Sequence, residues 1–211
     1  MPVLNNHKYA IALHTSTPQL GIAINNYDGE CRTLVLDLGR ALAAQLHQHL
    51  QQVLAPQTWQ DLEFMAVAKG PGGFTGTRVG VVTARTIAQQ LDIPLFGISN
   101  LAAVAAAQNS KSQDLLAVQM DARRGQLFVG IYQLDTQGHL QTYLEDTLMT
   151  VEAWQQTLNN LKPTYQLIKA EENIATTVTS ILDLAYADWQ RGKHPHWSEI
   201  IPYYGQHPVS G

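Results

Sequence analysis

Cysteine and charge are both scarce in this sequence. A single cysteine, Cys31, stands among 211 residues, and charged residues make up 14% of the chain. One thiol can form neither an internal disulfide nor a cysteine metal cage, so we expect a plain thiol and no metal centre. Globular domains typically carry about 25% charged residues. The low charge therefore leaves room for a buried contact with another protein, although the many Gln and Asn residues could supply polarity instead.

Basic residues and long apolar runs are also lacking. The chain has 13 Lys and Arg residues against 17 acids, for a net charge of −4. Nucleic acid is held mainly by Lys and Arg at its phosphates, so we expect no strong binding of RNA by this chain alone. No stretch approaches the roughly 20 apolar residues that span a bilayer, and the first eight residues contain no long apolar run. We expect a cytoplasmic protein.

Hydrophobic patterns in the first half predict a sheet with helices. Three strands joined by short turns, at 8–14, 19–26 and 31–38, are typical of an antiparallel meander, and Asp28-Gly29 favours one of the turns. A helix over 40–54 repeats leucine at helical spacing and ends at Pro56. Further elements are expected as strands 64–68 and 94–98 and helices 75–91 and 99–108, the last one capped by Ser99.

The second half repeats this theme. Strands are expected at 115–120, 126–134, 140–144 and 165–169, with helices over 151–161 and 171–189. The segment after Gly192 has no period and should pack irregularly. Together the patterns predict two related α/β lobes of the ribonuclease-H-like kind: an N-terminal lobe over residues 1–99 and a smaller C-terminal lobe over residues 100–211.

A glycine-rich loop at residues 70–80 (GPGGFTGTRVG) joins a predicted strand to a predicted helix. It holds five glycines in eleven residues, among them Gly70, Gly72, Gly73 and Gly76. Glycines permit positive φ and close backbone approach, and a helix start offers free N–H groups to an anion. The Gly-Lys-Ser/Thr ending of a P-loop is missing. A phosphate-binding turn and a close-packing turn both remain open.

The helix predicted after this loop is apolar on most sides. Only Arg78 and Arg85 are charged between residues 75 and 91. Such a helix needs cover on more than one face. The sheet can cover one face, and a neighbouring helix or a partner chain must cover another.

Three motifs resemble those of the TsaB (YeaZ) family. The glycine loop resembles the signature G-P-G-S-F-T-G-x-R-[IV]-G, with Gly73 where Ser is usual. Thr15-Ser16-Thr17 resembles the family's D-T-S-T, with His14 in the place of the Asp. Asp121-Ala122-Arg123-Arg124-Gly125-Gln126 resembles D-A-R-x-[GN]-[EQ]. The likeness spans residues 9–132, and the glycine motif is the most specific of the three.

The resemblance implies a two-lobed fold of the actin/Hsp70/sugar-kinase (ASKHA) type and a role without catalysis. Proteins of this family are expected to scaffold and activate TsaD, together with the ATPase TsaE, in placing a threonylcarbamoyl group on adenosine 37 (t6A) of tRNAs that read ANN codons. TsaC makes the threonylcarbamoyl-adenylate donor. No cofactor is expected on this chain, and tRNA would be reached only through the complex.

Pairing through the two N-lobe helices is a further implication, with TsaD or as a homodimer. The residues expected at that interface are Leu42, Leu46, His49, Leu50, Phe74, Thr75, Arg78, Val79, Val82 and Arg85.

The main alternative is a stand-alone ATP-binding kinase or ATPase of the ASKHA superfamily. It would need acidic Mg²⁺ ligands in both phosphate loops, and His14 supplies no such oxygen. Asp121 could serve in one loop. The histidines at 47 and 49 lie about 200° apart on a helix, so they cannot share a metal as an H-x-x-x-H pair would. The loop residues that could hold a nucleotide or only shape a turn are Thr15, Ser16, Thr17, Gly70, Gly72, Gly73, Gly76, Asp121 and Arg123.

Overall fold

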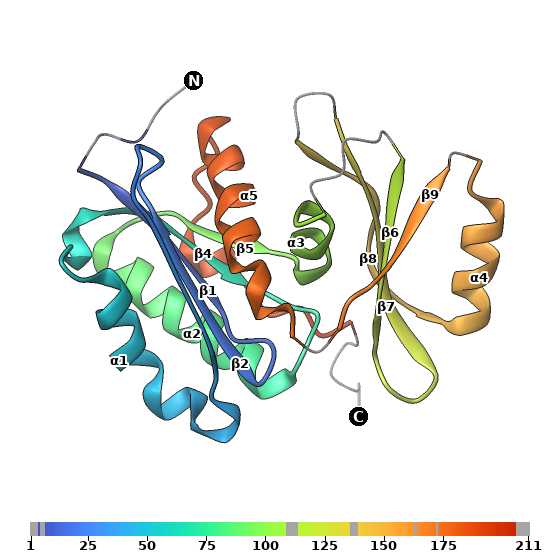
Figure 1. Ribbon diagram of the computed structural model, residues 1–211, viewed down its shortest axis with the longest axis horizontal. Coiled ribbons are helices and arrows are strands. Elements are labelled where there is room, and N and C mark those ends of the chain that lie inside the picture. Colours follow the sequence, from blue (N-terminus) through green and yellow to red (C-terminus); the bar gives the residue numbers. More distant parts are fainter. Residues whose placement is uncertain are drawn as a thin grey trace.

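A computed structural model describes residues 4, 7–108, 114–135, 139–162, 164–171 and 173–205 of the chain. Two β-sheets lie side by side, with helix α3 (Asn100–Ala106) between them (Figure 1). The first sheet has the order β3-β2-β1-β4-β5 and contains β1 (Tyr9–His14), β2 (Gln19–Asn25), β3 (Cys31–Asp37), β4 (Leu62–Ala68) and β5 (Leu95–Ile98). The second has the order β8-β7-β6-β9 and contains β6 (Leu115–Asp121), β7 (Gln126–Leu134), β8 (Leu140–Thr150) and β9 (Tyr165–Lys169).

The two sheets repeat one topology. In the first, β1, β2 and β3 pair antiparallel, and β4 joins β1 in parallel on the other side. In the second, β6 pairs antiparallel with β7, β7 pairs antiparallel with β8, and β9 joins β6 in parallel. The predicted meander and the two related lobes are thus confirmed, and most strand ends fall within two residues of the expected ones.

The central strands of the first sheet, β1, β2 and β4, are buried on both faces, under different helices. On β1, Ile11 and Leu13 point into the core beneath α1 (Leu42–Leu54) and α2 (Phe74–Leu91), whereas Ala10 and Ala12 point the other way. The small alanine side chains let α5 (Val178–Gln190) approach the sheet closely on that second face (Figure 1). Strand alternation therefore assigns bulky residues to one layer and small ones to the other.

Helix α5 crosses between the lobes. It follows the last strand of the second sheet along the chain, yet its side chains pack on the first sheet, where Ile181, Ala185 and Trp189 are buried. The helix expected over 171–189 instead begins as a 3₁₀ turn, η3 (Ile174–Thr177), and continues as α5. The boundary at residue 99 therefore separates the strands of the two sheets along the chain. It does not separate the packed layers, because α5 comes after residue 99 and packs on the first sheet.

The C-terminal segment also returns to the first lobe. The Leu95 N–H donates to the carbonyl oxygen of Pro195, and the Tyr203 N–H donates to that of Lys69 at 2.7 Å. A short turn, η4 (Trp197–Glu199), lies between these two points. The irregular packing expected after Gly192 is confirmed through Gly205, and the last six residues lie outside the described part.

Strand β8 is longer than expected, reaching Thr150 instead of residue 144. Its pairing with β7 shifts register near Gly130, so the alternation is broken in the middle of the strand. Helix α4 (Val151–Asn160) follows and buries Trp154 against one face of the second sheet. Across the described residues, no helix has the length and apolar character needed to cross a bilayer.

Candidate functional site

The glycine-rich loop lies directly against the turn that follows β1. The Gly73 N–H donates to the Ser16 carbonyl oxygen at 2.7 Å. The Thr15 hydroxyl donates to the Gly76 carbonyl oxygen at 2.8 Å. Two segments about 60 residues apart in sequence are therefore joined by reciprocal hydrogen bonds.

The glycines permit this close approach. A Cβ at Gly76 would overlap the Thr15 carbonyl oxygen, and one at Gly80 would overlap the Thr15 hydroxyl. A Cβ at Gly72 would lie 2.7 Å from the Ser16 carbonyl oxygen, closer than real Cβ atoms come. Of the two alternatives left open by the sequence, close packing is the role the structure assigns to these three glycines.

Gly73 and Gly70 differ from the other loop glycines. A Cβ at Gly73 would stand 3.2 Å from the Ser16 carbonyl oxygen, so a small shift would accommodate a side chain. The Ser of the family signature would therefore fit at this position with little rearrangement. Gly70 has φ +106°, a conformation that favours glycine, and a Cβ there would overlap the Tyr203 carbonyl oxygen.

Asn100 anchors the loop from α3, and sequence reasoning missed it. Its side-chain N–H donates to the Pro71 carbonyl oxygen at 2.7 Å, and its backbone N–H donates to the Gly70 carbonyl oxygen at 2.9 Å. Asn100 is wholly buried. The sequence signal that could have indicated Asn100 is its amide side chain, which directly follows the capping Ser99 at the start of an otherwise apolar helix.

His14 ends β1 and is wholly buried. Burial lowers the pKa of its imidazole from 6.5 to about 3, because the charged form is cut off from water. The ring is therefore neutral at neutral pH. The position that carries Asp in the family motif brings no negative charge for Mg²⁺ here.

The third motif forms a tight turn between β6 and β7 in the second lobe. The Asp121 carboxylate accepts the Arg123 N–H at 2.9 Å, so it caps its own turn. Arg123 and Arg124 both have positive φ, at 66° and 52°. A hydrogen bond within the turn holds the third motif in the second lobe. The other two motifs, the glycine loop and the Thr15–Thr17 turn, contact each other in the first lobe.

The expected interface residues of α1 divide into core and surface. Leu42, Leu46 and Leu50 are at most 5% exposed and lie in the chain's own core beside β1. Their assignment to a partner surface was wrong, because the leucine stripe of α1 faces the sheet. His49 is half-buried, and its Nδ1 lies 3.3 Å from the Gln52 side-chain oxygen.

On α2 the expected residues do reach the surface. Phe74 is 57% exposed and Val82 is 60% exposed, while Thr75 and Arg78 are exposed and Val79 is half-buried. Val81, Ala84 and Ala88 of the same helix are buried in the core. We call Phe74, Arg78, Val82 and Arg85 the α2 stripe, since their spacing places them along one side of the helix.

Aromatic rings of the C-terminal segment border the α2 stripe. The Tyr204 ring lies 4.6 Å from the Phe74 ring, centroid to centroid. The Arg85 guanidinium lies 5.7 Å from the centroid of the Trp197 ring, and that of Arg78 lies 5.3 Å from the Phe74 ring. The aperiodic sequence of this segment had no signal that would place it here.

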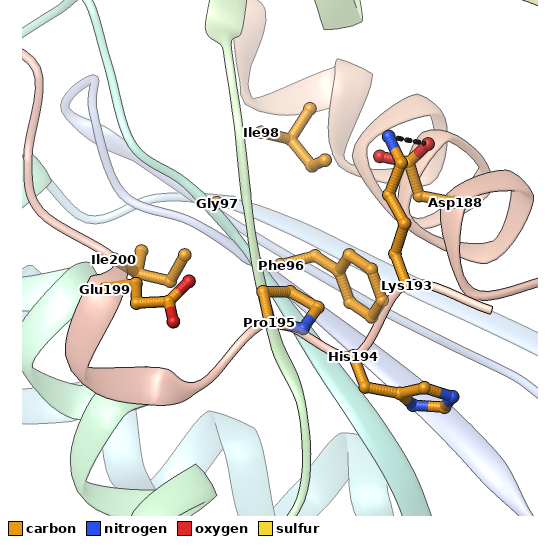
Figure 2. Close-up of a pocket in the computed structure, with 9 residues that line it drawn as sticks. All are labelled: Phe96, Gly97, Ile98, Asp188, Lys193, His194, Pro195, Glu199 and Ile200. Atoms are coloured by element: carbon orange, nitrogen blue, oxygen red, sulfur yellow. Dashed lines mark hydrogen bonds and ion pairs between the residues drawn. The ribbon is translucent and has the colours of Figure 1, made fainter. Parts of the chain in front are cut away.

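A shallow hollow of about 410 Å³ lies along β5 and contains none of the expected site residues. Figure 2 shows Ile200 and Glu199 on one side of the strand and an ion pair between Asp188 and Lys193 on the other. The two charged atoms of this pair lie 2.9 Å apart.

A half-buried carboxylate, Asp146, joins the two lobes and was also missed. Its oxygens accept hydrogen bonds from the Ser99 and Tyr132 hydroxyls. Burial raises the pKa of Asp146, and the two hydrogen bonds oppose that rise. Ser99 also accepts the Ala102 N–H, so the cap of α3 is tied to β8 of the second sheet.

Comparison with known proteins agrees with these motifs. Residues 38–190 match the family model described as TsaD, tRNA N6-adenosine threonylcarbamoyltransferase. The tRNA threonylcarbamoyladenosine biosynthesis protein TsaB of Bacillus subtilis (strain 168) is 38% identical over 151 residues, 68% of this chain and 63% of that protein. The TsaB of Escherichia coli (strain K12) is 29% identical over 133 residues, 61% of this chain and 56% of that protein. The chain thus spans less than two thirds of the length of these curated relatives.

Among solved structures, YeaZ from Pseudomonas aeruginosa superposes with a TM-score of 0.75 at 22% identity, over 93% of this chain and 99% of that one. The chain therefore has the fold of YeaZ, a two-lobed α/β fold, as expected. The chain belongs to the family of the TsaD model and, within it, to the TsaB (YeaZ) proteins.

Proposed function

We propose that this chain is a non-catalytic scaffold and activator subunit for threonylcarbamoylation of adenosine 37 in tRNAs that read ANN codons. It acts with a TsaD-like catalytic subunit and a TsaE-like ATPase. The names of its curated relatives support the pathway. The observation that supports a docking role is the α2 stripe, in which Phe74, Arg78 and Val82 are exposed and Arg85 is half-buried, on a helix that packs another side into the core.

The composition of the stripe suits a protein interface. Phe74 and Val82 leave more than half of their side-chain surface in water. Covering apolar surface contributes about 25 cal/mol per Å². Aromatic residues and arginine are enriched at the centres of protein interfaces, and Phe74, Arg78 and Arg85 are of these types. The first lobe, residues 1–99, would carry this docking surface.

Two features of the first lobe favour an accessory role over a stand-alone ATPase. The side of the Thr15–Thr17 turn that faces α2 is filled by Gly72, Gly76 and Gly80, which touch its backbone and side chains. His14 is neutral and buried where the motif has a carboxylate. Neither feature supplies a site for a Mg²⁺–phosphate group.

The test is reconstitution with the TsaD-like, TsaE-like and TsaC-like proteins encoded by the same genome. The nucleoside t6A, released from an unmodified tRNA, is quantified by mass spectrometry. We expect the isolated chain to hydrolyse no ATP and to form no t6A, and to raise the rate of the TsaD-like subunit when added. Robust ATP hydrolysis by a clean preparation of the chain alone would overturn the proposal.

A further inference from the structure

The C-terminal part of the described chain lies against both lobes. We call residues 193–205 the strap. Near its start, the Leu95 N–H of β5 donates to the Pro195 carbonyl oxygen at 3.2 Å. Trp197 and Ile200 then pack against the core of the first lobe. From there the strap passes the start of the glycine loop and reaches β7 of the second sheet (Figure 1). One short segment therefore contacts both lobes.

Tyr203 of the strap connects the two lobes through three contacts. Its N–H donates to the Lys69 carbonyl oxygen at 2.7 Å, directly after β4 of the first sheet. Its hydroxyl donates to the Asp146 carbonyl oxygen at 2.8 Å, on β8 of the second sheet. Its ring lies 6.5 Å from the Phe128 ring of β7, centroid to centroid, in an edge-to-face arrangement. This one residue is thus attached to both sheets.

Two glycines allow the strap to approach both lobes closely. Gly70, with φ +106°, faces the Tyr203 carbonyl oxygen, and a Cβ there would overlap that atom. Gly205, with φ +66°, lies on the Phe128 ring, and a Cβ there would overlap the ring. Both positions favour glycine in conformation as well as in space. The strap is therefore packed tightly against the glycine loop on one side and β7 on the other.

The packing of α3 between the lobes is largely apolar. Val104 of α3 lies in one hydrophobic cluster with Leu116 and Val118 of the second sheet. Apolar contact is non-directional, so it opposes separation of the lobes more than it opposes their rotation. Hydrogen bonds weaken steeply when their angle changes. Because domains move relative to one another unless a large hydrophobic interface prevents it, directional contacts such as those of Tyr203 are needed to hold the angle between the lobes.

We propose that the strap fixes the angle between the two lobes and that Tyr203 is its main attachment. When Tyr203 is detached, the lobes sample a wider range of angles about α3, while each sheet keeps its own core. This behaviour belongs to the isolated chain, so it does not depend on any partner.

The experiment measures the distance between the lobes by electron–electron double resonance of two spin labels on the full chain. One label is attached to Cys31, the single cysteine of the sequence, which is exposed on β3. The other is attached at Gln156→Cys, an exposed position of α4. The test variant is Tyr203→Ala, and the matched control is Tyr143→Ala, at an exposed tyrosine of β8. We expect a narrow distance distribution in the labelled parent and in the control, and one at least about twofold broader in Tyr203→Ala.

Two further variants separate the contacts of the strap. Tyr203→Phe keeps the ring beside Phe128 but loses the hydrogen bond to Asp146, so it should broaden the distribution less than Tyr203→Ala does. Gly205→Ala places a methyl group against the Phe128 ring and leaves Tyr203 unchanged, so it should also broaden the distribution. Thermal melts of each variant show whether the fold is intact. In the wild-type chain, the Tyr203 amide should be protected from hydrogen exchange, because it donates to Lys69.

Three outcomes would overturn the proposal: unchanged distributions in both Tyr203→Ala and Gly205→Ala, equal broadening in the Tyr143→Ala control, or a wild-type Tyr203 amide that exchanges as fast as an unfolded one. The exchange measurement needs no variant, so it decides the question even where a substitution prevents folding.

Discussion

Lowering the pH should destabilise the folded chain through His14. Its pKa is about 3 in the folded protein, because burial disfavours the charged ring, and 6.5 is its ordinary value. The unfolded chain therefore binds a proton below pH 6.5 that the folded chain does not. Stability from this residue is present above pH 6.5 and is lost as the pH falls towards 3. Each pKa unit is worth about 1.4 kcal/mol, so the loss at pH 5 is about 2 kcal/mol.

The assay is urea unfolding at pH 7.5 and pH 5, with His14→Asn as the test and His47→Asn, at an exposed helix position, as the control. Wild type and His47→Asn should each lose about 2 kcal/mol more between the two pH values than His14→Asn loses. If His14→Asn cannot fold, the proton resonances of the His14 ring in the wild-type protein give the same answer. They should not titrate between pH 8 and pH 5, and a midpoint near 6.5 would refute the reasoning.

Three further predictions concern the loop, the junction between the lobes and the surface. Gly76→Ala should lower the free energy of unfolding by about 3 kcal/mol, because the added methyl group meets the Thr15 backbone. Gly73→Ala should lower it by about 1 kcal/mol at most. Similar losses for the two variants in urea unfolding would contradict the packing role of Gly76. Asp146→Ala should cost about 2 kcal/mol in the same assay, since the Ser99 and Tyr132 hydroxyls lose their acceptor, and exposed Glu145→Ala should cost little. Val82→Asp should leave the melting temperature nearly unchanged but abolish co-purification with the TsaD-like subunit. The control Val151→Asp, in the second lobe, should leave both the melting temperature and co-purification unchanged. A complex retained by Val82→Asp would count against the docking surface.

Local sequence patterns determined most secondary structure and the special character of the glycine loop. Strands and helices follow from the alternation of apolar residues, and a run such as 8–14 differs plainly from a leucine-spaced helix such as 40–54. The sequence also allowed the exposed side of α2 to be predicted, because a helix that is apolar on most sides has more apolar surface than one sheet can cover.

Periodicity could not say what covers each apolar side. The leucines of α1, including Leu46, were assigned to a partner surface, yet they face the chain's own sheet. Helix α5 was recognised as amphipathic, but its packing on the other lobe's sheet was not visible from its sequence.

Contacts between distant residues decided the roles of single side chains. Whether Gly76 approaches a phosphate or a backbone depends on Thr15, 61 positions away, and Asp146 gains its partner Ser99 from 47 positions away. The sequence by itself determined the elements and the family motifs, because these depend on neighbours along the chain. Only the tertiary structure decided which glycines pack and which leucines are core, because burial depends on chain segments that meet only when the protein folds.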